Sequence, residues 1–302
     1  MLTILYRGPL NSCNYGCSYC PFAKRKVSRP VLQSDAERLD RFLDWCENAQ
    51  ERLSIFFTPW GEALIHHNYR TAIARLAALS HVDQVAIQTN LSCSVAWMAA
   101  LPRAKVGFWC TFHPGETPES VFVEKCRWMS ANGVRFSVGA VGKPEHLQNL
   151  CELRSVLPEH TYFWINALRG TKARRLSSDE AAAFAELDSL FELNLAGAKS
   201  FGRDCDAGWR TIAVDGDGNA TRCHFTPGRI GNLYSPDFLE MLKPRTCTAR
   251  MCRCHIGYSH MPELRFSELF GDGLLARAPQ VLPKPEAMRA RLPLMRAPAR
   301  TN

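Results

Sequence analysis

Short apolar segments alternate with amphipathic segments six times within the first 191 residues of this 302-residue chain. The apolar segments are rich in β-branched and aromatic residues on both faces, as are strands of a parallel sheet covered by helices. The segments between them repeat their apolar residues with the period of an amphipathic helix. The expected strands are residues 3–7, 54–58, 84–90, 106–112, 135–141 and 162–168, and the expected helices are residues 35–51, 67–80, 94–101, 118–131, 145–156 and 178–191.

Six strand–helix units in succession predict a parallel sheet with right-handed crossovers. We therefore expect an α/β fold, a partial (β/α)6 TIM-like barrel over residues 1–195. A small cysteine-rich α+β appendage is expected over residues 196–262, including a hairpin at residues 211–223. Residues 263–302, rich in Pro and Arg, are expected to form a loose extension or a strap against the barrel.

Two local patterns predict where helices begin. Ser34 and Glu37 have the spacing of a capping box. Thr117 is an expected N-cap, because Pro118 follows it and proline favours the first turn of a helix.

Charge and hydropathy argue against several classes of protein. The net charge is +8, but half of this excess lies in residues 272–302, so nucleic acid is not indicated as a partner. No segment has the length and apolar character of a membrane span, and the first residues lack the pattern of a signal peptide. We therefore expect a cytoplasmic protein without a membrane partner.

The chain contains 13 cysteines, and eight of them fall into two groups. In a reducing compartment, clustered cysteines more often bind metals or act in catalysis than form disulfides. The other five are expected to be small buried hydrophobic residues. These five are Cys46, Cys93, Cys110, Cys126 and Cys151.

The first group, Cys13, Cys17 and Cys20, follows the first expected strand with the spacing C-x3-C-x2-C. Three thiolates on one loop can hold three corners of an iron–sulfur cubane and leave the fourth iron open. A zinc site usually requires four ligands, and no fourth cysteine is nearby in the sequence. Polar residues also follow the ends of the next strands, where parallel α/β folds bind their ligands.

This loop resembles the cluster motif of the radical S-adenosylmethionine (SAM) superfamily. The resemblance implies a [4Fe-4S] cluster whose open iron binds SAM. Gly61 and Glu62 lie in a variant of the superfamily's Gly-Gly-Glu-Pro element, in which Trp60 and Ala63 depart from the pattern. The cofactor-binding residues implied by the resemblance are Tyr19 beside the adenine, Gly61 and Glu62 at the methionine amino group, and Asn90 and Ser137 at the ribose and carboxylate.

The second group begins with the spacing C-x12-G-x4-C, from Cys205 through Gly218 to Cys223. This spacing is similar to that of SPASM and twitch domains, which extend many radical SAM enzymes and hold auxiliary clusters. The resemblance implies one auxiliary iron–sulfur cluster, bound by four of five cysteines. The five candidates are Cys205, Cys223, Cys247, Cys252 and Cys254.

The chemistry implied is reductive cleavage of SAM to a 5′-deoxyadenosyl radical, which removes hydrogen from a peptide or small molecule. Such an oxidoreductase or maturase needs an external electron donor such as flavodoxin or ferredoxin. Four polar residues at or just past strand ends are candidates for contact with the substrate. They are His113, Glu116, Asn166 and Arg169.

Three alternatives stay open. The chain could be an iron–sulfur or zinc-binding structural or electron-carrier protein without SAM chemistry. A structural zinc bound with Cys254 or His255 could replace the auxiliary cluster. Glycyl-radical activating enzymes share the C-x3-C-x2-C spacing. The first strand is expected to begin at residue 3, which argues against a leader-dependent peptide maturase unless a separate partner binds the leader.

Overall fold

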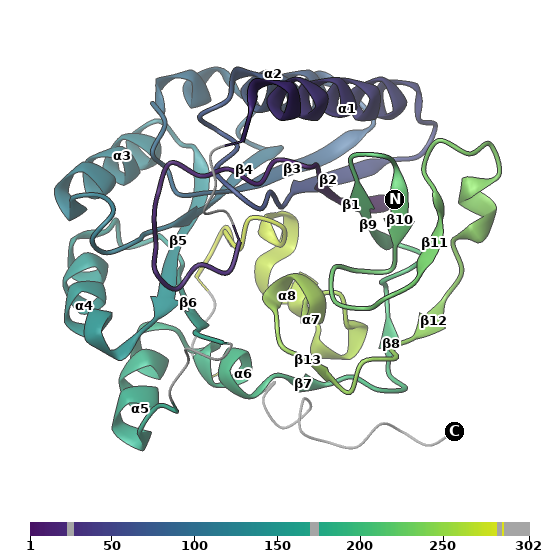
Figure 1. Cartoon of the computed structure of the whole chain (residues 1–302). Helices are drawn as coiled ribbons and strands as arrows, with labels where there is room; N and C mark the ends of the chain where they lie inside the picture. The colour runs from purple at the N-terminus through teal and green to yellow at the C-terminus, as the bar shows by residue number, and fades with distance from the viewer. Residues whose placement is uncertain (23–26, 170–174, 283–285, 287–302) are drawn as a thin grey trace.

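The computed structural model describes residues 1–22, 27–169, 175–282 and 286. Its centre is a run of six parallel strands in sequence order (Figure 1). Each of the six begins within two residues of an expected strand, which confirms the partial barrel. The strands are β1 (Leu2–Arg7), β2 (Leu53–Phe57), β3 (Val82–Thr89), β4 (Val106–Thr111), β5 (Arg135–Gly142) and β6 (Phe163–Ala167).

Helices cover the outer face of this sheet (Figure 1). They are α1 (Arg29–Asn48), α2 (His67–Ala78), α3 (Glu119–Ala131), α4 (Leu147–Val156), α5 (Ser178–Leu187) and α6 (Phe191–Ala196). The apolar stripe of α1, with Leu39, Phe42 and Cys46, is buried against the outward side chains of β1 and β2. Burial of this stripe stabilises the contact between helix and sheet, because it removes apolar surface from water.

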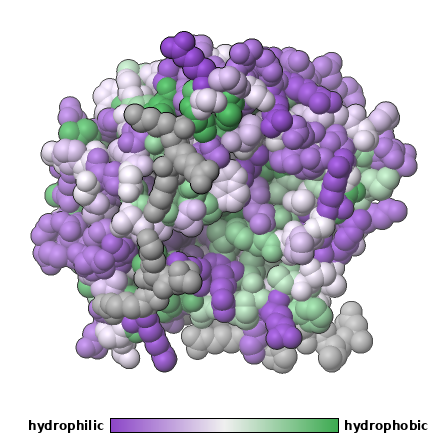
Figure 2. Space-filling view, in the orientation of Figure 1, coloured by the Kyte–Doolittle hydropathy of each residue, from purple (hydrophilic) through white to green (hydrophobic). Residues whose placement is uncertain are grey.

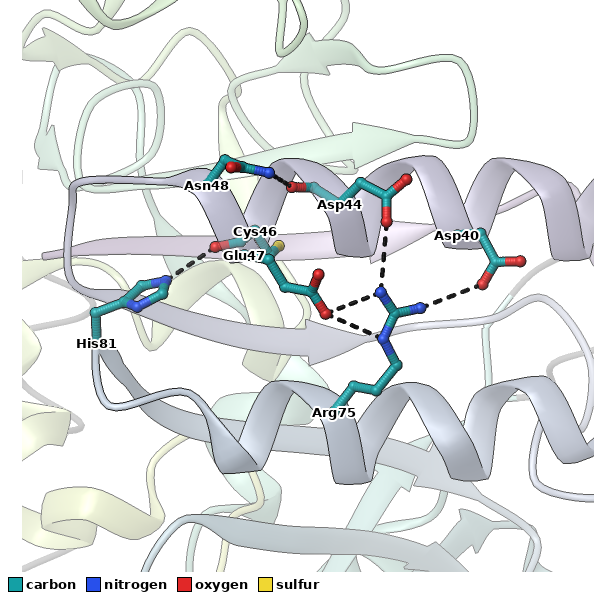
Figure 3. A network of polar contacts seen from close by, with 7 residues as sticks. All are labelled: Asp40, Asp44, Cys46, Glu47, Asn48, Arg75 and His81. Atoms are coloured by element: carbon teal, nitrogen blue, oxygen red, sulfur yellow. Dashed lines mark hydrogen bonds and ion pairs between the residues drawn. The ribbon is translucent and has the colours of Figure 1, made fainter.

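Helices α1 and α2 are also joined by charge (Figure 3). The Arg75 guanidinium of α2 lies 2.8 Å from a Glu47 carboxylate oxygen, with Asp44 at 3.4 Å and Asp40 at 3.6 Å. These three acidic residues lie three or four residues apart on one face of α1, so the single guanidinium of Arg75 contacts successive turns of that helix. The network is solvent-accessible, so it fixes how the helices align more than it adds to stability.

The helix boundaries correct three expectations. Helix α3 begins at Glu119, so its N-cap is Pro118 and not Thr117. Helix α1 begins at Arg29, with Pro30 in its first turn, so Ser34 and Glu37 lie inside the helix and form no capping box. Residues 94–101 were expected to be an α-helix, but only the 3-10 helix Ala96–Ala100 forms there. A capping box is present instead at α5, where the Ser177 hydroxyl accepts from the Glu180 amide.

The expected hairpin is confirmed, and it continues the barrel sheet. It consists of β9 (Thr211–Asp215) and β10 (Asn219–Thr221), followed by β11 (Arg229–Asn232). Strand β9 pairs in parallel with β1, so the strand order is β11-β10-β9-β1-β2-β3-β4-β5-β6. The free edge of β1 is thereby covered, which removes an exposed row of backbone groups. The sheet therefore crosses the predicted domain boundary at residue 195.

The remaining elements after α6 are short. They are β7 (Ala198–Lys199), β8 (Asp204–Cys205), β12 (Arg245–Thr246), β13 (Met251–Cys252), α7 (His255–Tyr258) and α8 (Phe266–Phe270), with 3-10 helices at Phe238–Met241, Pro262–Leu264 and Gly271–Gly273. One further 3-10 helix, Pro144–His146, lies earlier, between β5 and α4. Strand β12 pairs with β8, and β13 pairs with β7. The first ladder places Cys205 beside the segment that leads to Cys247, and the second places Cys252 beside the residues that follow α6.

The segment from α7 to Ala278 fills the inside of the barrel (Figure 1). Phe266 and Phe270 pack in one apolar cluster with Trp109 and Trp164 of the inner sheet face. Arg277 is also fully buried there, with its guanidinium over the faces of both tryptophans and 3.7 Å from an Asp188 oxygen. The expected extension thus begins as part of the core, and its residues 283–285 and 287–302 lie outside the described residues.

Four of the five scattered cysteines are buried as expected, whereas Cys151 on α4 is exposed, so the prediction was wrong for Cys151.

Among the described residues, none of the helices combines the length and the hydropathy that a bilayer crossing needs.

The inner core predicts a large effect of truncating Phe266, whose side chain is 1% exposed. We expect Phe266→Ala to lower the free energy of unfolding by about 3–5 kcal/mol, because it leaves a cavity inside the barrel. Phe201→Ala is the control, since Phe201 is 66% exposed and its truncation should cost under about 0.5 kcal/mol. Urea unfolding followed by circular dichroism measures both, and equal effects would show that α8 is not packed in the barrel.

Candidate functional site

A cavity of about 430 Å³ lies at the carboxyl ends of the parallel strands. It contains all three cysteines of the first group. Most of the other predicted site residues also line it, although they come from the loops after five different strands. These residues are Tyr19, Gly61, Glu62, Asn90, His113, Asn166 and Arg169.

The cysteine loop is locked to the loop after β2 by a backbone crossing at Gly61. A Cβ on Gly61 would lie 1.7 Å from the carbonyl oxygen of Ser12, so only glycine permits this approach. The next amide, that of Glu62, donates a hydrogen bond to the same Ser12 oxygen at 3.1 Å. The glycine–glutamate turn and the cysteine loop therefore lie at the same rim of the sheet and in direct contact.

The Glu62 carboxylate links the loop after β2 to the end of β3. It is 2% exposed and accepts hydrogen bonds from the amide of Asn90 at 2.5 Å, the amide of Leu64 at 2.9 Å and the hydroxyl of Thr89 at 2.9 Å. Burial nevertheless raises the pKa of Glu62 to about 7, against the lowering effect of these donors. The carboxylate is thus fixed in orientation and costly to ionise until a cation approaches it.

Asn90 connects this network to the first cysteine. Its side-chain amide nitrogen lies 3.1 Å from the Asn14 side-chain oxygen and 3.7 Å from the Cys13 sulfur. Its own side-chain oxygen accepts from the amide of Ser92, which fixes the amide orientation. Asn90 therefore contacts both the cysteine loop and the glutamate that were predicted to act with it.

The loop after β4 braces the cysteine loop from the other side. His113 Nδ1 lies 2.9 Å from the Tyr19 hydroxyl and 3.3 Å from the Cys17 sulfur. Glu116 does not line the cavity, and its carboxylate instead accepts from the Gly16 amide at 2.9 Å. Burial, and to a lesser degree the Glu116 charge, raises the pKa of Cys17 to about 12.

The three thiols of the first group are neighbours. Burial is the main reason that the pKa of Cys13 is raised, and the charges of Glu62 and Cys20 add to it. Cys20 raises the pKa of Cys17 in the same way. Backbone amides also point at two of the sulfurs, since Tyr15 donates to Cys13 at 3.5 Å and Phe22 donates to Cys20 at 3.4 Å.

The opposite wall of the cavity is basic. Arg169 donates to the carbonyl oxygens of Asn194 and Arg253, and all three of these residues line the cavity. Cys254 lines this wall as well. The sequence had placed Asn166 and Arg169 among the candidates, but it gave no signal for Asn194 or Arg253, because both lie outside the strand-end loops.

Aromatic side chains border the cavity and stay accessible to solvent. Phe22 is 55% exposed, Phe225 is 49% exposed, and the rings of Phe22 and Trp60 lie 4.6 Å apart. On the face drawn in Figure 2, apolar side chains gather in a hollow near the middle, with hydrophilic side chains around it. Such a border suits a ligand with apolar surface.

Ser137 lies apart from this cavity. It is fully buried in β5, where its hydroxyl donates to the Ala276 carbonyl at 2.6 Å and accepts from the Trp164 indole at 3.1 Å. Its contacts are therefore with the segment that fills the barrel.

The thiols of the second cysteine group influence one another, and one of them reaches the cavity. Burial raises the pKa of Cys205 to about 11, and its neighbours Cys247 and Cys223 add to the shift. Cys252 packs against Gly257, and Cys254, Cys223 and Cys205 contribute after burial to its raised pKa. Of these five thiols only Cys254 lines the cavity, where the strand-end residues surround it.

Within the described residues, no group of three or more Cys, His, Asp or Glu side chains is arranged to hold a single metal ion. His255, considered above as a zinc ligand, is buried among Trp109, Tyr258, Phe266 and Phe270. Its ring therefore packs within the inner core.

A scan against protein-family models matches no family, and a search of curated proteins finds no match. Solved structures do share the fold. Streptococcus suis SuiB bound to S-adenosylmethionine superposes with a TM-score of 0.53 at 14% identity, over 79% of this chain and 64% of SuiB, less than two thirds of that protein. The structure of anSMEcpe with bound AdoMet and the Cp18Cys peptide gives a TM-score of 0.53 at 16% identity, over 91% of this chain and 88% of that one. At such identities the similarity establishes the fold.

The crossing at Gly61 predicts that a single methyl group disrupts the site. We expect Gly61→Ala to lower the free energy of unfolding by roughly 1–3 kcal/mol, because the two loops must separate to admit the new carbon. Gly16→Ala in the cysteine loop is the matched control, since its Cβ would meet no atom closer than 3.9 Å. Chemical unfolding measures both variants, and the prediction is wrong if Gly61→Ala is no less stable than Gly16→Ala.

Proposed function

We propose that this protein is a radical SAM enzyme, with a [4Fe-4S] cluster at Cys13, Cys17 and Cys20. The carrying observation is that these three thiols share one cavity with Gly61, Glu62 and Asn90 at the carboxyl ends of the parallel strands. The similarly folded structures of SuiB and anSMEcpe, both with bound SAM, support the proposal.

The residues present fit the cluster. Three neighbouring thiols face one cavity, and backbone amides point at two of the sulfurs, as they do around iron–sulfur clusters. A cubane spreads its thiolates further apart than one metal ion does, which is compatible with the absence of a single-ion site among the described residues. The raised pKa values of Cys13 and Cys17 mean that loading the cluster releases protons.

The bound cluster would supply the electron that splits SAM into methionine and a 5′-deoxyadenosyl radical. The protein's own task is to orient SAM. Glu62 supplies the one carboxylate among the described residues that line the cavity, and three donors already fix its direction. It is therefore suited to bind the SAM amino group, and this ion pair would favour the ionised carboxylate.

We propose a second, auxiliary iron–sulfur cluster at Cys205, Cys223, Cys247 and Cys252. Cys247 and Cys223 add to the raised pKa of Cys205, and Cys223 and Cys205 add, after Cys254, to the raised pKa of Cys252. One antiparallel ladder places Cys205 beside the segment that leads to Cys247, and the Phe225 amide donates to the Cys223 sulfur at 3.4 Å. Cys254 is excluded from the set, because it lines the cavity that the SAM cluster would share with the substrate.

The substrate is proposed to be a peptide or a small molecule, which is bound in the same cavity. Asn166, Arg169, Arg253 and the exposed aromatic border would contact it. The structure of anSMEcpe contains a bound peptide, which supports a peptide as the class of substrate here. An external donor of the flavodoxin or ferredoxin type would supply the electrons.

The function is tested by anaerobic reconstitution with iron and sulfide, followed by dithionite and SAM. We expect 5′-deoxyadenosine to form, and we expect none from Cys17→Ala because that cluster lacks a ligand.

Glu62→Gln should weaken SAM binding by about tenfold or more, since a charged hydrogen bond is lost. Glu124→Gln is the matched control, because Glu124 is exposed on α3 and lies outside the cavity. A fully iron-loaded protein that neither binds SAM nor forms 5′-deoxyadenosine would instead be a structural or electron-carrier protein.

The auxiliary site is tested by iron analysis of single cysteine variants. We expect Cys205→Ala, Cys223→Ala, Cys247→Ala and Cys252→Ala each to lose about half of the iron, because each removes one of four ligands. Cys254→Ala is the control and should keep the full amount. Zinc in place of iron, or iron loss from Cys254→Ala alone, would contradict the assignment.

A further inference from the structure

The sulfur of Cys17 has a polar surrounding that the other two cysteines of its group lack. His113 Nδ1 lies 3.3 Å from it and 2.9 Å from the Tyr19 hydroxyl, and this hydroxyl is close enough to lower the pKa of the Cys17 thiol. The sulfur, Nδ1 and the hydroxyl therefore form a triangle of polar groups. Cys13 and Cys20 are approached by backbone amides, and Cys13 by the more distant Asn90 amide at 3.7 Å.

The position of His113 is fixed by its surroundings. It follows β4 directly, and its carbonyl accepts from the Glu116 amide, which closes a tight turn. The Glu116 carboxylate in turn holds the Gly16 amide at 2.9 Å, one residue before Cys17. The imidazole lies between two tyrosine rings, at 5.9 Å from Tyr15 and 6.1 Å from Tyr19. The contact with the sulfur is therefore built by two loops.

Once Cys17 is a metal ligand, the hydrogens carried by the Tyr19 hydroxyl and by His113 Nδ1 decide which group donates to which. A ligating cysteine is a thiolate and can only accept. The Tyr19 hydroxyl donates to it, and Nδ1 can complete the triangle only if it carries a proton. In that arrangement the Nδ1–H donates to the thiolate or to the Tyr19 oxygen, which strengthens the donation by the hydroxyl.

We propose that His113 and Tyr19 are positioning residues that donate hydrogen bonds to the Cys17 thiolate and so raise the reduction potential of the SAM cluster. This inference rests on the proposed function. Hydrogen bonds to a ligating sulfur stabilise the reduced cluster more than the oxidised one, because reduction adds negative charge. His113, predicted from the sequence to contact substrate, is assigned here to the cluster, and Tyr19 acts through its hydroxyl.

The test is a redox titration of the reconstituted protein in the absence of SAM, followed by electron paramagnetic resonance. We expect His113→Ala and Tyr19→Phe each to shift the midpoint potential to more negative values. At one fixed solution potential the ratio of reduced to oxidised cluster should fall about tenfold, which is 59 mV for one electron. The full-length Cys205→Ala variant serves as the background, so that the signal comes from the first cluster.

Two further variants distinguish this role from a merely structural one. His113→Asn can place an amide N–H near the position of Nδ1, so we expect it to restore most of the potential. His146→Ala is the control, because that ring packs edge-on against Tyr19 at 6.1 Å. It should leave the potential unchanged.

Unchanged potentials in Tyr19→Phe and His113→Ala, with full iron content, would overturn the inference while leaving the proposed function intact. Failure of the unmodified chain to assemble any cluster would instead overturn the proposed function, and this inference with it. If His113→Ala does not fold, Tyr19→Phe and His113→Asn decide the question. A lowered potential in the first and a retained one in the second would support the assignment.

Discussion

The candidate site depends on one close backbone crossing, that of Gly61 over the carbonyl of Ser12. The crossing joins the loops after two neighbouring strands and sets the cysteine loop against the glutamate turn. The buried Glu62 carboxylate then extends the connection to the end of β3, and His113 with Glu116 extends it from the end of β4. Four strand ends are thus held by contacts between main chain and polar side chains. A loop bearing three cysteines can be rigid because all its neighbours are fixed.

The six parallel strands do not close into a full barrel, but later segments of the chain fill its interior. Six parallel strands leave an open side and an inner face that would be exposed, and the chain after α6 resolves both problems. Strand β9 pairs with β1 and covers its edge, while α7 and α8 fill the interior with aromatic side chains. Arg277 follows them into the core, where two tryptophan faces and Asp188 compensate part of the cost of burying its charge. The C-terminal residues therefore belong to the same cooperative unit as the strands.

The two cysteine groups differ in their relation to the cavity. The first group lines it with all three thiols, whereas the second group lines it only through Cys254. The hairpin before Cys223 continues the sheet beside β1, and the chain after β1 leads into the first group. A ligand in the cavity would contact Arg169, Arg253 and Cys254 as well as the cysteine loop and Glu62. Residues from both ends of the chain therefore line one cavity.

The sequence alone determined the order of the strands and the residue types at their ends. Strand periodicity and the C-x3-C-x2-C spacing are local properties, so they could be recognised without knowing which segments touch. Ser137 shows the limit of such reasoning, because the family resemblance implied a ligand contact for it, whereas only packing decides that its hydroxyl meets Ala276 and Trp164. Ser34 and Glu37 had the right spacing for a cap, but Pro30 starts the helix earlier. The pairing of β9 with β1, the place of Cys254 in the cavity lining and the burial of Arg277 bring together residues far apart in the chain. Such contacts form only when the whole core closes, and for that reason the tertiary structure decided them.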